Sequence, residues 1–195
     1  MPEIPEDEPF TPFARWYKQA SDSEPLAETM MLATATADGV PSVRAVLLKG
    51  ADAAGFVFYT NLESRKANEM AANPHVALCF HWKSLARQIR IEGTISPVND
   101  AEADTYFASR YRDSQLGAWA SLQSQPLANR AVFEERFAAY SREYADKPVP
   151  RPANWSGFRV RPTRIEFWLD RPFRLHDRFV FTRDGDTWRK QRLYP

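Results

Sequence analysis

The sequence predicts a mainly β protein, an antiparallel barrel with helices at its periphery. Segments of strand character outnumber helical ones, and they do not alternate with helices as they do in a doubly wound sheet. Asp-Gly pairs at residues 38–39 and 184–185 each separate two such segments, which is typical of hairpins. With 195 residues and no internal repeat, the chain is long enough for one domain with a real core. We expect that domain to span residues 10–195, after a mobile acidic segment over residues 1–9.

The N-terminal half is expected to contain one helix followed by a meander of strands. Phe13, Trp16 and Tyr17 recur at helical spacing and predict a helix over residues 12–20 that packs on the body through its aromatic side chains. Alternating apolar residues then predict five strands, over residues 30–37, 42–49, 55–60, 75–82 and 87–98.

Three further helices and three further strands are expected. The helices cover residues 64–72, residues 100–110 with Asn99 as the cap, and residues 127–145. Aromatic side chains recur three and four residues apart in the last helix, which indicates core packing: Phe133, Phe137, Tyr140 and Tyr144. The C-terminal strands are expected over residues 157–169, 174–182 and 187–193.

Composition excludes several classes of protein. The 26 Lys and Arg residues are balanced by 25 Asp and Glu residues, so no global field of the kind that attracts nucleic acid is expected. No apolar run has the length of a membrane span, and the N-terminus is acidic where a secretory signal is basic. Cys79 is the single cysteine, which excludes an internal disulfide. We therefore expect a soluble protein of the reducing cytoplasm.

Familiar ligand motifs are missing from the sequence. The seven glycines never occur as Gly-x-Gly, so side chains must grip any bound phosphate. Three histidines and one cysteine show no metal-ligand spacing, and no metal site is expected.

The run from Arg174 to Arg178 is the strongest functional lead. If it is a strand, alternation directs Arg174, His176 and Arg178 to one face, where an anionic or electron-rich ligand would relieve their repulsion. A charged edge strand that discourages aggregation explains the same pattern.

Two further clusters can hold phosphate. Arg65 and Lys66 follow Ser64 at the start of a helix, where cations oppose the helix dipole unless an anion binds there. Tyr106 and Arg110 share one helix face, and Ser114 follows close by. Solvated charges are the alternative for the first cluster, although the cost of placing cations at a helix start favours anion binding. A helix-stabilising pair with a cap is the competing explanation for the second.

Weaker signals surround these clusters. Arg44 and Lys49 fall on opposite faces of a strand, although the strand end can bring both to the rim of a pocket. The amides of Gln88 and Gln123 and the indole of Trp168 suit the edge and face of a planar heterocycle, and Ser124 lies next to Gln123.

Together these segments resemble the pyridoxine/pyridoxamine 5′-phosphate oxidase family, over nearly the whole chain from about residue 10. The segments that carry the resemblance are residues 44–49, 59–66, 87–88, 110–119, 123–124, 165–168, 174–178 and 192–195. Members of this family often have a longer, basic N-terminal segment that closes over the substrate. This chain departs from them there, and also at Tyr111, where proline is common, and at Tyr194, where a small residue is common.

The resemblance implies a homodimer of FMN-binding split barrels, with two active sites at the subunit interface. It assigns FMN to residues of both subunits, namely Arg44, Ala45, Val46, Leu47, Leu48, Lys49, Tyr59, Thr60, Arg65, Lys66, Gln88, Gln123, Ser124, Trp168 and Arg178. It assigns the substrate phosphate to Lys49, Tyr106, Arg110 and Ser114, and the substrate ring to Arg174, Leu175 and His176, with Arg174 and His176 as the catalytic pair.

The implied reaction is hydride transfer from C4′ of pyridoxine or pyridoxamine 5′-phosphate to flavin N5, followed by reoxidation by O2 to give H2O2. The alcohol gives pyridoxal 5′-phosphate directly, and the amine gives it through an imine that releases ammonia. Two alternatives remain open: an FMN oxidase of another pathway, such as a phenazine-type enzyme, and a flavin- or pyridoxal-phosphate-binding protein without turnover.

Overall fold

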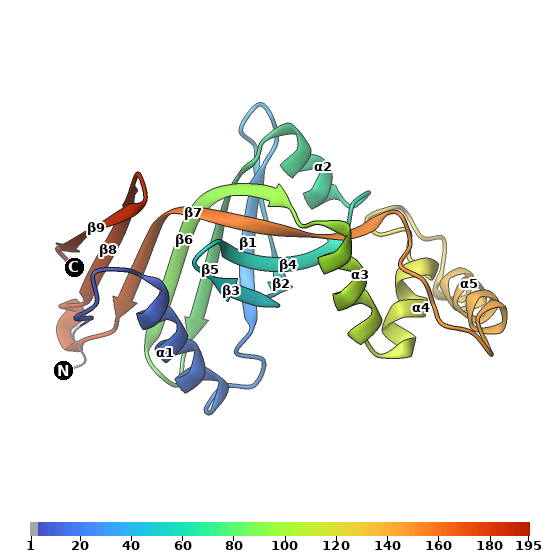
Figure 1. The fold of residues 1–195 in the computed structure, drawn as a ribbon, viewed down its shortest axis with the longest axis horizontal. Coiled ribbons are helices and arrows are strands. Elements are labelled where there is room, and N and C mark those ends of the chain that lie inside the picture. The colour runs from blue at the N-terminus through green and yellow to red at the C-terminus, as the bar shows by residue number, and fades with distance from the viewer. Residues whose placement is uncertain (1–3) are drawn as a thin grey trace.

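The computed structural model describes residues 4–195, which form one antiparallel sheet of nine strands with helices around it (Figure 1). The strands are β1 (Thr29–Ala35), β2 (Pro41–Leu47), β3 (Gly50–Asp52), β4 (Gly55–Asn61), β5 (His75–Trp82), β6 (Arg87–Pro97), β7 (Trp155–Leu169), β8 (Asp177–Asp184) and β9 (Thr187–Leu193). The main path runs β2-β1-β5-β6-β7-β4-β3, and β8 pairs with both β7 and β9. The prediction of a mainly β, antiparallel fold is confirmed.

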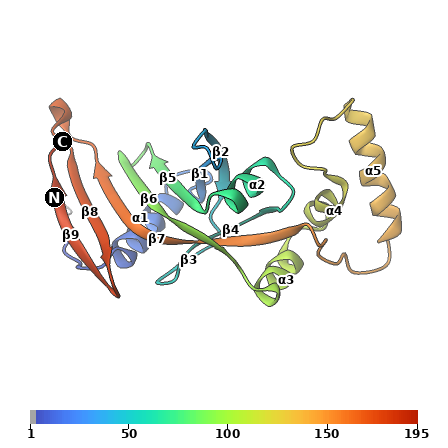
Figure 2. The same ribbon diagram turned by 90° about the horizontal axis from the view of Figure 1, so that it is seen from above.

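The helices are α1 (Phe10–Ser21), α2 (Arg65–Ala72), α3 (Asp100–Ser109), α4 (Arg112–Ala120) and α5 (Arg130–Glu143), with a short 3-10 turn, η1, at Pro172–Arg174. Figures 1 and 2 show α3, α4 and α5 gathered at one end of the molecule and the β8–β9 hairpin at the other. Strand β7 connects the two ends, because its first half pairs with β4 and its second half with β8.

The core lies inside the curled sheet and is rich in aromatic side chains. Phe56, Phe80 and Phe167 are fully buried there. Helix α1 contributes Trp16, whose ring meets Phe167 edge to face at 5.3 Å between centroids. The aromatic spacing that predicted this helix thus marks the face that α1 buries.

The first residues of the described chain contact the body. Ile4 is only 2% exposed, and the Lys190 side chain donates hydrogen bonds to the backbone oxygens of Ile4 and Glu6. Residues 1–3 lie outside the described residues. The mobility expected for residues 1–9 stays a prediction, and these contacts argue against it for residues 4–6.

Three elements have no counterpart among the predicted helices and strands, namely helix α4, the short strand β3 and the turn η1. The expected core packing of the last helix is also only partly right. No residue within α5 is buried, and of its four aromatic side chains only Tyr144, just beyond the helix, is. Asn99 caps α3 as predicted, since its side chain accepts a hydrogen bond from the Glu102 backbone N–H at 2.8 Å.

Among the described residues, no helix combines the length and the apolar character that crossing a bilayer requires.

Candidate functional site

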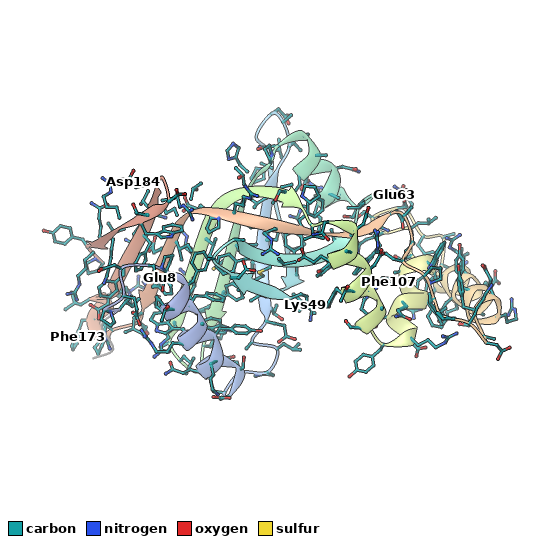
Figure 3. The ribbon with its side chains drawn as sticks, in the orientation of Figure 1. Glu8, Lys49, Glu63, Phe107, Phe173 and Asp184 are labelled. Carbon is teal, nitrogen blue, oxygen red and sulfur yellow. The ribbon has the colours of Figure 1, made fainter. Side chains whose placement is uncertain are left out.

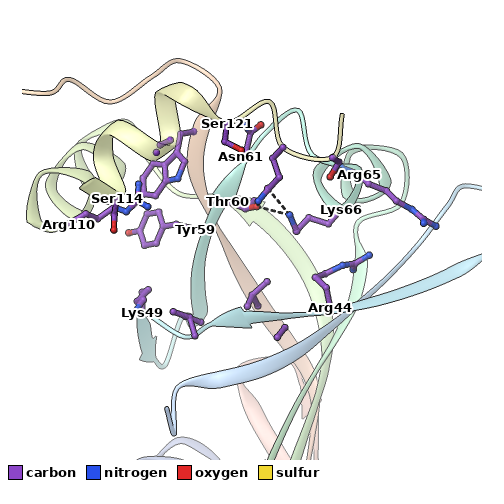
Figure 4. A pocket seen from close by; sticks show the side chains of 18 of the residues that line it. Arg44, Lys49, Tyr59, Thr60, Asn61, Arg65, Lys66, Arg110, Ser114 and Ser121 are labelled. Carbon is purple, nitrogen blue, oxygen red and sulfur yellow. Dashed lines mark hydrogen bonds between the residues drawn. The ribbon is translucent and has the colours of Figure 1, made fainter. Parts of the chain in front are cut away.

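A cleft of about 840 Å³ opens between the β2 edge, the end of β4 and the helices α2, α3 and α4 (Figure 4). The predicted site residues that line it are Arg44, Ala45, Val46, Leu47, Lys49, Tyr59, Thr60, Arg65, Lys66, Tyr106, Arg110, Ser114, Gln123 and Ser124. Arg44 and Lys49 share the cleft because β2 ends at Leu47, which releases Lys49 from strand alternation. The structure therefore gathers three of the sequence clusters in one cavity.

Cationic side chains occupy both ends of the cleft. In Figure 4, Arg44, Arg65 and Lys66 lie at one end. Lys49 and Arg110 lie at the other. This separation suits a ligand, or a pair of ligands, with two anionic groups.

The first end is held by hydrogen bonds around Lys66. Its Nζ donates to Thr60 Oγ1 at 3.0 Å, to Ser64 Oγ at 3.1 Å and to Gln123 Oε1 at 2.9 Å. Burial lowers the pKa of Lys66, and the nearby Arg44 charge lowers it further. Two clustered cations at the N-terminus of α2, beside the backbone N–H groups of its first turn, are suited to binding a phosphate.

The second end contains a partly buried guanidinium, that of Arg110. Nη1 of Arg110 is buried and has no hydrogen-bond partner within residues 4–195, and burial lowers the pKa of this guanidinium. The Arg110 Cζ lies 4.8 Å from the centroid of the Trp155 ring. Because buried polar groups are normally hydrogen-bonded, this unmet donor on a residue that lines the cleft favours a ligand nearby.

Stacked aromatic rings form one wall of the cleft. The Tyr59 and Tyr106 rings stack at 4.0 Å, and Tyr59 and Trp155 stack at 5.3 Å. Burial, with Glu102 and Tyr106 nearby, raises the pKa of Tyr59 to about 12, so its hydroxyl stays protonated at neutral pH. Gly157 makes room for this stack, because a Cβ there would lie 2.7 Å from the Tyr59 ring.

Seven predicted site residues do not line this cleft: Leu48, Gln88, Trp168, Arg174, Leu175, His176 and Arg178. Leu48 is buried in the core. The others belong to β6, β7, β8 and the turn between β7 and β8.

Three of these residues form a row across neighbouring strands. Gln88 on β6 pairs with Trp168 on β7, and Trp168 pairs with Arg178 on β8. Arg178 is fixed by Glu166, a carboxylate only 2% exposed, at 2.8 Å from both Nε and Nη2. The His176 ring packs on Trp168 at 4.6 Å between centroids. An amide, an indole, an imidazole and a guanidinium therefore do lie together, but away from the cleft of the same chain.

The expectation of a strand from Arg174 is wrong. Pro172–Arg174 form the turn η1, in which Phe173 and Arg174 have φ values of 59° and 62°, and β8 begins only at Asp177. Strand alternation therefore does not place Arg174 and His176 on one face with Arg178. Phe173 is 93% exposed at the end of the molecule opposite to Phe107 (Figure 3).

The sequence reasoning missed several residues at the cleft, notably Ser42, Asn61 and Trp155, which line it. It also missed Glu69 beneath it, which bonds both Arg44 and Arg65. Trp155 opens a strand that was predicted to begin at residue 157, and Gly157, two residues later, was the available signal of a close contact.

Two family models match the chain. "Pyridoxamine 5′-phosphate oxidase" matches residues 18–142, and "Pyridoxine 5′-phosphate oxidase C-terminal dimerisation region" matches residues 155–195. The first covers every cleft-lining residue except Trp155, and the second covers Trp155, Trp168, His176 and Arg178.

Similar curated proteins carry the name pyridoxine/pyridoxamine 5′-phosphate oxidase. The protein of Gluconobacter oxydans is 65% identical over 189 residues, covering 96% of this chain and 94% of its own length. The protein of Rhodospirillum rubrum is 57% identical over 201 residues, covering all of both chains.

Solved structures share the fold. PhzG from Burkholderia lata, in complex with tetrahydrophenazine-1-carboxylic acid, superposes with a TM-score of 0.94 at 31% identity and covers 100% of this chain and 97% of its own. A pyridoxamine 5′-phosphate oxidase-related, FMN-binding protein from Nostoc punctiforme gives 0.78 at 16% identity, covering 96% and 98%, which speaks for the fold alone.

Proposed function

Because the chain belongs to the pyridoxine/pyridoxamine 5′-phosphate oxidase family, we propose that it oxidises pyridoxamine 5′-phosphate and pyridoxine 5′-phosphate to pyridoxal 5′-phosphate, with FMN as cofactor and O2 as electron acceptor. The alcohol and O2 give the aldehyde and H2O2. The amine, O2 and water give the aldehyde, ammonia and H2O2.

The residues at the α2 end of the cleft fit the phosphate of FMN. Arg44, Arg65 and Lys66 supply positive charge, and the N-terminus of α2 supplies backbone N–H groups. Gln123 and Ser124 steady this end, because Gln123 accepts from Lys66, and Ser124 Oγ accepts from the Arg65 backbone N–H at 3.2 Å. When bound, FMN supplies the hydride acceptor for the reaction and passes the electrons to O2.

The observation that carries the substrate assignment is the unpartnered, buried Nη1 of Arg110. Lys49, Tyr106 and Ser114 line the same end of the cleft. A phosphate there would accept bonds from the guanidinium, the ammonium and the hydroxyls at once. We assign these four residues to binding and orienting the substrate phosphate, which holds the reactive carbon at a fixed distance from it.

The row of Gln88, Trp168 and Arg178 is assigned to a second copy of the chain. These residues do not reach the cleft of their own subunit, and two of them lie within the region matched as a dimerisation region. We propose that they complete the flavin site across the interface, with Arg174, Leu175 and His176 beside the substrate ring. Arg174 and Arg178 would add positive charge where the reduced flavin is anionic.

An apolar strip next to the cleft supports an interface there. Val43 and Leu47 on β2 and Met31 on β1 are exposed large hydrophobic residues. Ala45 pairs directly with Met31, so Val43, Ala45 and Leu47 lie on one face of the sheet with it. Burying this strip against a second copy would remove it from water.

The proposal is tested by adding pyridoxamine 5′-phosphate to the purified FMN-loaded protein. Without O2 the flavin absorbance should bleach. With O2 the aldehyde, ammonia and H2O2 should form in equal amounts. A flavin that stays oxidised without O2, or the lack of aldehyde with it, defeats the assignment and favours a binding protein without turnover.

A phenazine-type oxidase is the second candidate, supported by the 31% identity to PhzG over the full chain. Tetrahydrophenazine-1-carboxylic acid carries a carboxylate and no phosphate. A cation-rich second end with Lys49 and Arg110 favours the phosphorylated substrate. Turnover of a dihydro- or tetrahydrophenazine carboxylate at a rate above that of pyridoxamine 5′-phosphate would make the phenazine-type oxidase the preferred function.

A further inference from the structure

Glu69 on α2 is a buried carboxylate directly beneath the cationic end of the cleft. Its side chain is 5% exposed. It lies one turn after Arg65 on the same helix. Its side chain points from α2 toward the sheet, where it contacts Thr34 on β1 and Ser42 on β2. A carboxylate so close to a proposed phosphate site would weaken anion binding through charge alone, so its presence there calls for another role.

The two Glu69 oxygens divide the surrounding groups between them. Oε1 accepts from Arg65 Nε at 2.8 Å. Oε2 accepts from Ser42 Oγ at 2.6 Å and from Arg44 Nη2 at 3.2 Å, and it also accepts from Thr34 Oγ1. One carboxylate thus ties an arginine of β2 to an arginine of α2.

The hydroxyls extend this restraint to the rest of the Arg44 guanidinium. Nη1 donates to Thr34 Oγ1 at 2.6 Å and to the Leu32 backbone oxygen at 3.1 Å, and Nη2 donates to Ser42 Oγ. Burial by itself would raise the pKa of Glu69, but hydrogen bonds from Ser42, Thr34 and Arg65 outweigh it and lower that pKa to about 2. The group is therefore a carboxylate throughout the physiological range.

We infer that Glu69 is a positioning residue, which holds Arg44 and Arg65 in the orientation that grips the FMN phosphate. The inference rests on the proposed FMN site and deepens it. Two long arginine side chains lose much rotamer freedom on binding a ligand, and a buried carboxylate that fixes them beforehand reduces this cost. Lys66 does not contact Glu69 and is held instead by Thr60, Ser64 and Gln123.

Charge and position make opposite predictions for the variant Glu69→Gln. If Glu69 acted only as a negative charge, its removal would strengthen FMN binding. If it positions the arginines, FMN binding weakens. The amide nitrogen of Gln cannot accept the hydrogen bonds that one Glu69 oxygen accepts, so it loses its hold on at least one arginine. We expect the Kd for FMN to rise about tenfold, which equals about 1.4 kcal/mol.

The experiment titrates flavin-free protein with FMN and with riboflavin and follows the quenching of flavin fluorescence. Riboflavin lacks the phosphate, so its Kd should change less than about twofold in Glu69→Gln. The matched control is Glu134→Gln, which removes an exposed carboxylate from another i,i+4 pair with arginine, on α5 and outside the cleft. It should leave both Kd values unchanged.

Each outcome decides between the accounts. An unchanged or tighter Kd for FMN in Glu69→Gln, or an equal loss for FMN and riboflavin, overturns the positioning role while the proposed function stands. A wild-type protein that binds FMN no better than riboflavin overturns the proposed phosphate site and the inference with it. If Glu69→Gln does not fold, Ser42→Ala is tested instead, because it removes a hydroxyl that joins Glu69 to Arg44. The same comparison applies: the Kd for FMN should rise and the Kd for riboflavin should change less.

Discussion

The guanidinium of Arg110 lies against the indole ring of Trp155, with its Cζ 4.8 Å from the ring centroid. The aromatic face stabilises the buried cation without using its hydrogen-bond donors, and Nη1 has no partner within the described chain. The partly buried guanidinium therefore has one unmet donor, which a bound anion would satisfy.

We therefore expect Arg110→Ala to lower kcat/KM for pyridoxamine 5′-phosphate about 100-fold, or about 3 kcal/mol, while FMN stays bound. Steady-state kinetics and the flavin content of the purified variant test this. Arg112→Ala is the matched control, because Arg112 donates to backbone oxygens of Tyr144 and Lys147 and not into the cleft. Loss of FMN from Arg110→Ala would show that the two cationic ends have been assigned the wrong way round.

Arg65→Ala should behave in the opposite way. It removes one donor from the proposed FMN phosphate site and leaves the substrate end intact, so the Kd for FMN should rise about tenfold. At saturating FMN the KM for pyridoxamine 5′-phosphate should stay within about twofold of wild type. A large rise in that KM with unchanged FMN affinity contradicts the assignment of Arg65.

Gly157→Ala should disturb the aromatic wall. The new Cβ would lie 2.7 Å from the Tyr59 ring and 3.0 Å from Val98 Cγ2, so the Tyr59 ring must shift. We expect a loss of about 1–3 kcal/mol in the free energy of unfolding, together with weaker FMN binding. Gly117→Ala meets no atom within 4 Å and should stabilise α4 by about 0.5–1 kcal/mol. Equal free energies of unfolding for the two variants in chemical denaturation would refute the tight contact between residue 157 and the Tyr59 ring.

Acid should remove the contribution of Glu69 to stability. The folded-state pKa is about 2, below the ordinary value of 4.5, so the carboxylate stabilises the fold above about pH 4.5 and this contribution is lost as the pH falls toward 2. The difference between the two pKa values corresponds to about 3 kcal/mol. Chemical denaturation of flavin-free wild type and Glu69→Gln should therefore show a gap of this order at pH 7 that closes near pH 2. A gap that does not change with pH would mean that the ionised carboxylate contributes nothing.

Local pattern predicted most strands and the cationic clusters, because both depend on neighbouring residues. Strand alternation alone assigns Arg44 and Lys49 to opposite faces. Both reach the cleft because β2 ends at Leu47, which is the alternative that the sequence left open. Arg174 shows the limit of strand alternation, since the turn that begins at Pro172 replaces the first residues of the expected strand.

Contacts between distant segments could not be predicted from such patterns. Glu69 bonds Thr34 and Ser42, which lie 35 and 27 residues away in the sequence. Trp155 likewise reaches Tyr59 only through the pairing of β4 with β7. A site divided between two copies was expected only from the family resemblance, and the separation of the cleft from the Gln88–Trp168–Arg178 row within one chain supports that proposal.

The central claim is that each active site combines the cleft of one subunit with the β6–β8 row and the η1 turn of another. Mixing Arg110→Ala with Arg174→Ala, each nearly inactive alone, tests it directly after the subunits have been exchanged. In a statistical mixture half of the dimers are mixed, and each mixed dimer has one intact site and one doubly altered site, so about a quarter of wild-type activity should return. If both residues serve the site of their own chain, every site stays damaged and no activity returns, which would contradict the account.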